Sequence, residues 1–188
     1  IYYTDNTCVK AANHNSSKTA LGIVVHVTDG GIHGQIMTPG PVDKSGNRTS
    51  SYHKSMVWSN NGSDLASLPN YSSASEASKD YDSCGNTGKI SASIYPAAWA
   101  ASKYAPTSAT SGKWCLPAAG IVYNIYNNRD VIQTAILKIG GIKFEYPYDC
   151  LWSSSESDFS YAWYSCLSFD KGLLTTYKII NGNYVWPV

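Results

Sequence analysis

Residues 151–188 constrain the fold of this chain more than any other stretch does. In this stretch, residues typical of a protein core, which we call the frame, alternate with residues typical of a protein surface. The frame reads as core and turn residues: Trp152, Trp163, Leu167, Gly172, Tyr184 and Val185. The residues between them mix aromatic, aliphatic, hydroxyl and acidic side chains. An antiparallel strand with one face in the core would alternate between apolar and polar positions. This segment does not, so we expect part of it to be covered by, or to contact, a partner.

The period of two in a β-strand assigns the faces of the stretch around Trp163. Trp163 and Leu167 fall on one face and are expected to point into the core. Tyr164 and Cys166 fall on the other face and are expected to point outward. We therefore expect the second face to carry part of the contact surface.

The candidate ligand-binding residues are the surface-like residues of this segment. They are Asp158, Phe159, Ser160, Tyr161, Tyr164, Cys166, Leu174, Thr176, Tyr177, Ile180 and Trp186. Aromatic members would act as anchors, while hydroxyl and acidic members would set the orientation of a ligand by hydrogen bonds. For Phe159, Leu174 and Ile180 the alternative is that they complete the core, since apolar residues are usually interior. Trp186 fits either position.

The length and charge of the chain limit its fold and its partners. The 188 residues suit a single domain over residues 1–188 with a large buried core. Charged residues make up 14% of the chain and the net charge is +1, which argues against nucleic acid as a partner. No stretch approaches the roughly 20 apolar residues needed to insert into a membrane. The chain starts at Ile1 rather than Met, so we expect a processed, exported protein.

The five cysteines follow no metal-binding pattern, because no CxxC pair occurs. We expect no metal and no cofactor. If a disulfide forms, Cys84 and Cys115 are the expected partners, and Cys166 is expected to be unpaired. The odd number of cysteines leaves at least one free thiol or an intermolecular bond.

The order of the predicted elements is strands, then helices, then strands. A glycine turn at residues 29–31 predicts a hairpin, and Pro96 marks the start of a helix. Residues 59–83 are rich in Ser, Asn, Asp and Gly and predict a long surface loop. The pattern indicates an α+β domain with helices flanking an antiparallel sheet. The expected strands are residues 1–4, 21–28 and 32–38, with further strands after residue 141. The expected helices are residues 86–94, with residues 86–87 as the cap, and residues 96–104, 118–126 and 131–139.

Several motifs spread along the chain resemble one bacterial family. They are Gly112-Lys113-Trp114-Cys115-Leu116-Pro117, Leu151-Trp152-Ser153-Ser154-Ser155-Glu156, Ala162-Trp163, Gly172 and Tyr184-Val185-Trp186-Pro187-Val188. Together they look like a bacterial C-type-lectin-fold family with W-x-LP, YWSSTE-like, AW and closing YVRPV segments. Leu151 stands where the family usually has Tyr, and Trp186 where it usually has Arg. The resemblance implies a C-type lectin fold, with an antiparallel sheet flanked by two or three helices and long surface loops.

The resemblance also implies a function. Many members of this family are variable proteins of diversity-generating retroelements, which mutate adenines in the codons of a C-terminal cassette. Residues 149–188 would be that cassette here. The implied protein is an exported ligand-binding or adhesion domain at a bacterial cell surface, at a pilus tip or on a phage particle. Its expected partner is an unknown protein or glycan on another cell surface, with other pilus subunits as further partners.

Two alternatives remain open at this point. Cys150 and Cys166 could mimic the reactive cysteine pair of formylglycine-generating oxidases, although the RGG-type segment of those enzymes is missing. A calcium-dependent sugar-binding lectin would carry EPN or QPD and WND triplets, and none occurs. The acidic pair Glu156 and Asp158 reads as a solvated loop rather than a calcium site, which needs about 6–8 oxygen ligands. No catalytic motif is present, so we expect that the chain is not an enzyme.

Overall fold

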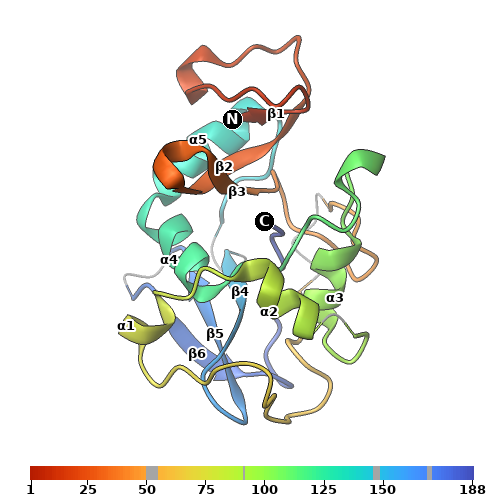
Figure 1. Cartoon of the computed structure of the whole chain (residues 1–188), viewed down its shortest axis with the longest axis vertical. Coiled ribbons are helices and arrows are strands. Elements are labelled where there is room, and N and C mark those ends of the chain that lie inside the picture. The colour runs from red at the N-terminus through yellow and green to blue at the C-terminus, as the bar shows by residue number, and fades with distance from the viewer. Residues whose placement is uncertain (50–54, 91, 146–148, 169–170) are drawn as a thin grey trace.

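Two three-stranded antiparallel sheets, one from each end of the chain, are connected by a central run of helices (Figure 1). The structure is a computed structural model that describes residues 1–49, 55–90, 92–145, 149–168 and 171–188. The α+β class is therefore confirmed. The first sheet has the order β1-β2-β3 and the second the order β4-β5-β6. The strands are β1 (Tyr2–Tyr3), β2 (Ala20–Thr28), β3 (His33–Met37), β4 (Cys150–Glu156), β5 (Tyr161–Cys166) and β6 (Leu174–Tyr177).

The first sheet contains the predicted hairpin. β2 pairs with β3 from Ile23 opposite Met37 to Thr28 opposite His33. The turn between them is a short 3₁₀ segment, η2 (Asp29–Gly31), in which Gly30 has a φ of 67°. Glycine adopts this left-handed conformation without the steric cost that a side chain would bring. The glycine turn and both strands are thus confirmed.

In the part of the chain that the structure describes, five α-helices lie between the two sheets in the sequence. They are α1 (Ala74–Ala77), α2 (Ser83–Lys89), α3 (Pro96–Lys103), α4 (Ala119–Asn127) and α5 (Arg129–Lys138), with the 3₁₀ segments η1 (Ala11–Asn13) and η3 (Ser108–Thr110). Pro96 occupies the first turn of α3 as predicted, because a first-turn residue has no helical partner for its N–H. The predicted helices 118–126 and 131–139 correspond to α4 and α5. Among the described residues, no helix is long and apolar enough to span a bilayer.

The prediction for α2 was wrong. This helix begins at Ser83 and not at the expected cap of residues 86–87, because the Asp82 side chain accepts the Gly85 N–H at 3.0 Å. Asn86 and Thr87 are buried instead. The Asn86 amide donates to the Asp80 carboxylate at 2.8 Å, and the Thr87 hydroxyl accepts the Leu116 N–H at 2.9 Å. The two residues that resembled a helix cap therefore form hydrogen bonds with other segments of the chain instead.

The long segment 59–83 runs past the end of the second sheet and includes the short helix α1 (Figure 1). It is attached to the sheet by backbone contacts. The Tyr71 N–H donates to the Glu156 carbonyl at 3.1 Å, and Asn70 forms a parallel bridge with Glu156. Its surface character was predicted, but Leu68, Ala77 and Asp80 within it are buried. The segment is therefore a cover for one end of the sheet.

Strands β4 and β5 of the second sheet are covered on both of their faces, whereas the edge strand β6 is partly exposed along its length. On one face, Leu151 and Trp163 belong to a hydrophobic cluster that also contains residues of α4 and α5. On the other face, Trp152 and Ala162 belong to a second cluster with residues of α3, and Tyr164 packs against that cluster. A strand covered on both faces has no solvent side, so it shows no apolar–polar alternation. The irregular pattern of residues 151–156 and 162–167 therefore reflects two-sided burial.

Two disulfides link described cysteines. Cys84 and Cys115 are joined, as predicted. Cys150 and Cys166 are also joined, so the prediction that Cys166 is unpaired was wrong. These two residues stand directly opposite each other in the antiparallel register of β4 and β5, which brings their side chains together. Cys8 is a free, exposed thiol.

Candidate functional site

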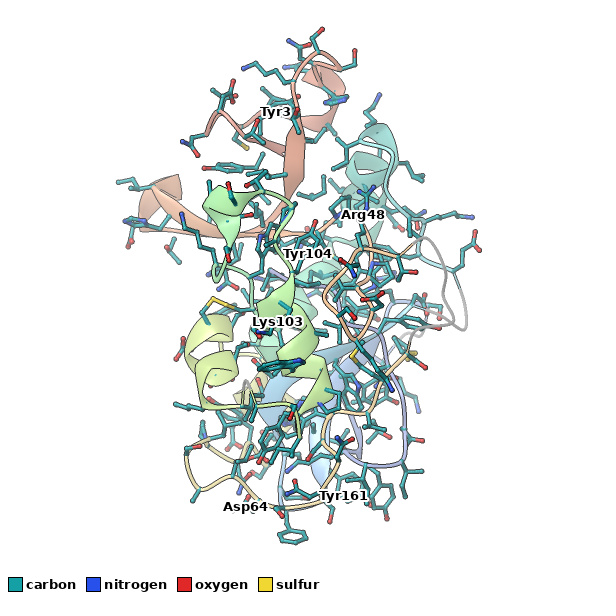
Figure 2. The ribbon with its side chains drawn as sticks, turned by 90° about the vertical axis from the view of Figure 1, so that its right-hand side faces the viewer. Tyr3, Arg48, Asp64, Lys103, Tyr104 and Tyr161 are labelled. Atoms are coloured by element: carbon teal, nitrogen blue, oxygen red, sulfur yellow. A yellow bond between two sulfur atoms is a disulfide. The ribbon has the colours of Figure 1, made fainter. Side chains whose placement is uncertain are left out.

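The end of the second sheet exposes several large side chains. We define the tip surface as the solvent-facing side chains of residues 157–161 and 174–181. Phe159 is 62% exposed, Tyr177 44% and Ile180 69%. Figure 2 shows Tyr161 and Asp64 at this end of the molecule. A cluster of exposed aromatic and aliphatic side chains is unusual on a monomeric surface and is typical of contact sites.

A pair of tyrosines forms the centre of the tip surface. Tyr161 of β5 stands opposite Tyr177 of β6, and their ring centroids are 4.4 Å apart with an interplanar angle of 36°. The pKa of Tyr161 is raised above 10.0, first because of its hydrogen bond with Tyr177 and second because of partial burial. The pair thus presents two aromatic rings whose positions are set by strand register.

The loop between β4 and β5 is ordered by Asp158. Its carboxylate oxygen Oδ1 accepts the N–H groups of Ser160 at 2.8 Å and of Tyr161 at 2.9 Å. The Ser157 N–H in turn donates to the Tyr161 carbonyl at 3.0 Å. Aspartate stabilises tight turns in this way because its short side chain reaches the backbone two or three residues ahead. Phe159 is therefore held at the apex of a defined turn.

A buried ion pair lies directly beneath the tip surface. Lys178 and Glu156 are both 0% exposed, and the Lys178 ammonium contacts the Glu156 carboxylate. The ammonium also lies 5.1 Å from the centroid of the Trp58 ring. Burial raises the pKa of Glu156, and the neighbouring Lys178 partly offsets this effect. The expectation of a solvated Glu156 was therefore wrong.

Sequence reasoning missed Lys178 altogether. A signal was present, because Lys178 is the only basic residue between Tyr177 and the end of the chain and is flanked by Tyr177 and Ile179. A lone lysine in an apolar stretch needs an acidic partner if it is buried. Its partner lies 22 residues earlier, at Glu156, and no local pattern links the two.

Most of the predicted site residues are at least partly exposed, in the turn after β4 or along β6. Exposed or partly exposed members of that set are Asp158, Phe159, Ser160, Tyr161, Leu174, Thr176, Tyr177 and Ile180. The inward positions of Trp163 and Leu167 are confirmed, since both are buried. Tyr164 was expected to point outward, but it is half-buried against Trp152, with ring centroids 6.1 Å apart. Its face of the sheet is covered by the second cluster.

Two of the predicted site residues are not at the surface. Cys166 is 3% exposed and bonded to Cys150, because both faces of β5 are covered. Trp186 is fully buried and packs on Phe144, with ring centroids 5.2 Å apart. Both predictions were wrong for the same reason, namely that core packing reaches further into the C-terminal segment than its sequence indicates.

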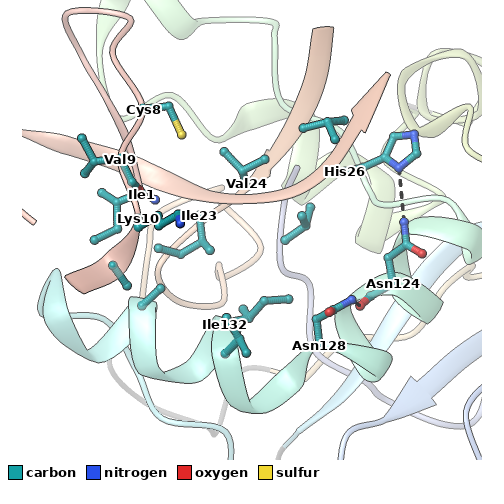
Figure 3. A pocket seen from close by; sticks show the side chains of 15 residues that line it. Ile1, Cys8, Val9, Lys10, Ile23, Val24, His26, Asn124, Asn128 and Ile132 are labelled. Atoms are coloured by element: carbon teal, nitrogen blue, oxygen red, sulfur yellow. Dashed lines mark hydrogen bonds between the residues drawn. The ribbon is translucent and has the colours of Figure 1, made fainter. Parts of the chain in front are cut away.

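A separate groove of about 710 Å³ lies between β2 and the helices α4 and α5 (Figure 3). Its walls are mainly aliphatic and include Ile23 and Ile132. At one end the Asn124 amide donates to the His26 Nδ1 at 3.2 Å. None of the predicted site residues lines this groove.

Comparison of the chain with protein-family models, with curated proteins and with solved structures finds no match. Within the described ranges, no three or more His, Cys, Asp or Glu side chains form a group that could hold a metal ion. Function is therefore inferred from the residues and geometry of the tip surface.

Proposed function

We propose that this chain is a ligand-binding or adhesion domain of the C-type lectin fold, and that its tip surface recognises a protein or glycan partner. The observation that carries the proposal is the exposure of Phe159, Tyr177 and Ile180 at one end of a sheet in which large residues such as Leu151, Trp152 and Trp163 are buried. These side chains contribute little to the core. Their exposure is instead what a contact surface requires.

The physical properties of the tip surface suit binding. An aromatic or aliphatic anchor that becomes fully desolvated against a partner is worth about 2 kcal/mol or more. Phe159 and Tyr177 are candidates for such anchors, and their neighbours in sequence, Asp158 and Thr176, are polar residues that are at least partly exposed. The turn and the strand register already fix the backbone, so little conformational entropy is lost on binding.

The same arrangement supports the proposal that residues 149–188 are a variable cassette. Frame residues such as Trp152 and Trp163 are buried, whereas Phe159 and Ile180 contact solvent. Exchange of an exposed side chain usually changes stability by no more than about 0.5 kcal/mol. The tip could therefore be diversified by a retroelement while the fold is retained. A genomic copy of this coding segment that differs from it only at adenines would test this origin.

Two disulfides are consistent with an exported protein, because disulfides persist mainly in oxidising compartments. We accordingly propose a location at a bacterial cell surface, at a pilus tip or on a phage particle. If the domain lies at a pilus tip, other pilus subunits would be further partners.

The experiment compares two matched double variants on a glycan array and an array of extracellular proteins. Phe159→Ala/Tyr177→Ala removes the tip anchors, and Ile32→Ala/Val131→Ala removes two apolar side chains elsewhere that are even more exposed. We expect both variants to melt near the wild-type temperature. The tip variant should lose binding by at least about tenfold, while the control binds normally. Equal binding by wild type and tip variant would refute the proposal.

A further inference from the structure

Lys178 makes more contacts than an ion pair requires. Its ammonium donates to the backbone carbonyls of Asp158 at 2.8 Å and Phe159 at 3.1 Å, besides contacting Glu156. A fourth oxygen, the Ser63 carbonyl, lies at 3.4 Å. An ammonium has three N–H donors and no acceptor, so it can satisfy several inward-facing carbonyls at one point.

These contacts join three separate segments of the chain. Asp158 and Phe159 belong to the turn after β4, and Ser63 belongs to the segment 59–83. Lys178 itself follows β6, and its own backbone N–H donates to the Ser160 carbonyl at 3.0 Å. Backbone carbonyls that turn away from water need such donors. The turn that presents Phe159 is thus held from below by one buried side chain.

We propose that Lys178 is a positioning residue of the tip surface. It fixes the backbone of residues 158–160 from the inside, so that the side chains above can differ without a change in loop conformation. The inference rests on the proposed binding function of the tip. It also means that Lys178, although it lies within residues 149–188, belongs to the invariant frame.

A purely structural role of the buried pair is the competing explanation, and stability alone does not separate the two. Removal of one partner leaves an uncompensated buried charge, whereas removal of both charges is often tolerated. The double variant Lys178→Met/Glu156→Gln therefore tests the carbonyl contacts without an unpaired charge. The single variant Glu156→Gln leaves the lysine charge unpaired and so lowers global stability, but it keeps the lysine contacts to Asp158 and Phe159.

The test measures loop order in the free protein, without any ligand. The two readouts are the amide hydrogen exchange of residues 157–161 and the rate of chymotrypsin cleavage after Phe159. We expect Lys178→Met/Glu156→Gln to increase both rates by at least about tenfold, while the amides of residues 163–165 stay protected. In Glu156→Gln, the exchange of residues 157–161 relative to that of residues 163–165 should remain near the wild-type ratio. The control Lys18→Met/Asp5→Asn, which removes the exposed pair at 2.7 Å, should change neither rate.

Two outcomes overturn the proposal. One is wild-type protection of residues 157–161 in Lys178→Met/Glu156→Gln. The other is an equal loss of protection in Glu156→Gln, which would assign the loop order to the ion pair instead of the carbonyl contacts. If the double variant does not fold, the comparison of Glu156→Gln with Lys178→Gln, which keeps a shorter neutral donor, replaces it. Because no ligand is used, the result is independent of whether the tip binds a partner.

Discussion

Trp163 and Tyr164 are adjacent in β5 and pack on opposite faces of the sheet, each against a different hydrophobic cluster. Consecutive strand residues always point to opposite faces. Both faces of β4 and β5 are covered, the edge strand β6 is partly exposed along its length, and β5 begins at the solvent-facing end of the sheet. The tyrosines Tyr161 and Tyr177 lie there, one opposite the other.

The hydrogen bond between these two tyrosines should be visible in an alkaline titration. Because Tyr177 raises the pKa of Tyr161 above 10.0, Tyr177→Phe should move that pKa back toward 10.0. In the wild type the unfolded chain ionises first, so stability is lost as pH rises above about 10. The variant should lose less stability over the same rise in pH. Ultraviolet absorbance of the phenolate measures the shift, and an unchanged Tyr161 pKa in the variant would contradict it.

Glu156 should make stability depend on pH in an unusual direction. Its pKa is raised by burial, so the folded state binds a proton more readily than the unfolded chain. The contribution of this group is therefore largest below about 4.5 and decreases as pH rises through the folded-state pKa. In Lys178→Met the cation that offsets the effect of burial is gone, so the pKa of Glu156 should rise further. The loss of stability with rising pH should therefore extend over a wider pH range.

Urea unfolding at several pH values measures this effect. At neutral pH, Lys178→Met should lose about 3–5 kcal/mol, because Glu156 is left as an unpaired buried charge. Part of that loss should be recovered as the pH falls and Glu156 is protonated. Lys178→Met/Glu156→Gln serves as the control and should lack this recovery. A loss in Lys178→Met that is the same at all pH values would show that Glu156 is not its source.

The disulfide between Cys150 and Cys166 should contribute measurably to stability. The two cysteines are 16 residues apart, and a cross-link that closes a loop of this size is worth about 3 kcal/mol. We expect Cys150→Ala/Cys166→Ala to lower the free energy of unfolding by about 2–4 kcal/mol. Cys8→Ser, which changes a free exposed thiol, should have an effect below about 0.5 kcal/mol. Comparable effects of the two changes would contradict the structure.

Asp158 should stabilise the tip turn through its acceptor atom and not through its charge. Asp158→Ala removes the acceptor for the Ser160 and Tyr161 N–H groups and should cost about 1 kcal/mol. Asp158→Asn keeps a side-chain oxygen at the same place and should cost less than about 0.5 kcal/mol. Chemical denaturation measures both values. A larger loss in the asparagine variant would point to the charge instead.

Local signals in the sequence predicted several elements well. The glycine turn after β2 and the proline at the start of α3 act on their own neighbours, and so their effects can be read directly. Exposure was also favoured for Tyr161 and Tyr177, which are partly exposed and exposed, respectively, and for Tyr164, which is half-buried. Phe159 was left open between core and surface, and it is exposed. The predicted cap of α2 failed because Asp82, an equally local signal, competed for the same role.

The sequence by itself determined the α+β order, the hairpin, three of the helices and the chemical character of the tip surface. Only the tertiary structure decided which faces are buried, because a second hydrophobic cluster covers the side of β5 that was expected to be open. It also decided the pairing of Cys150 with Cys166 and of Glu156 with Lys178. These partners are distant in sequence, and strand register, which is a property of the folded sheet, brings them together.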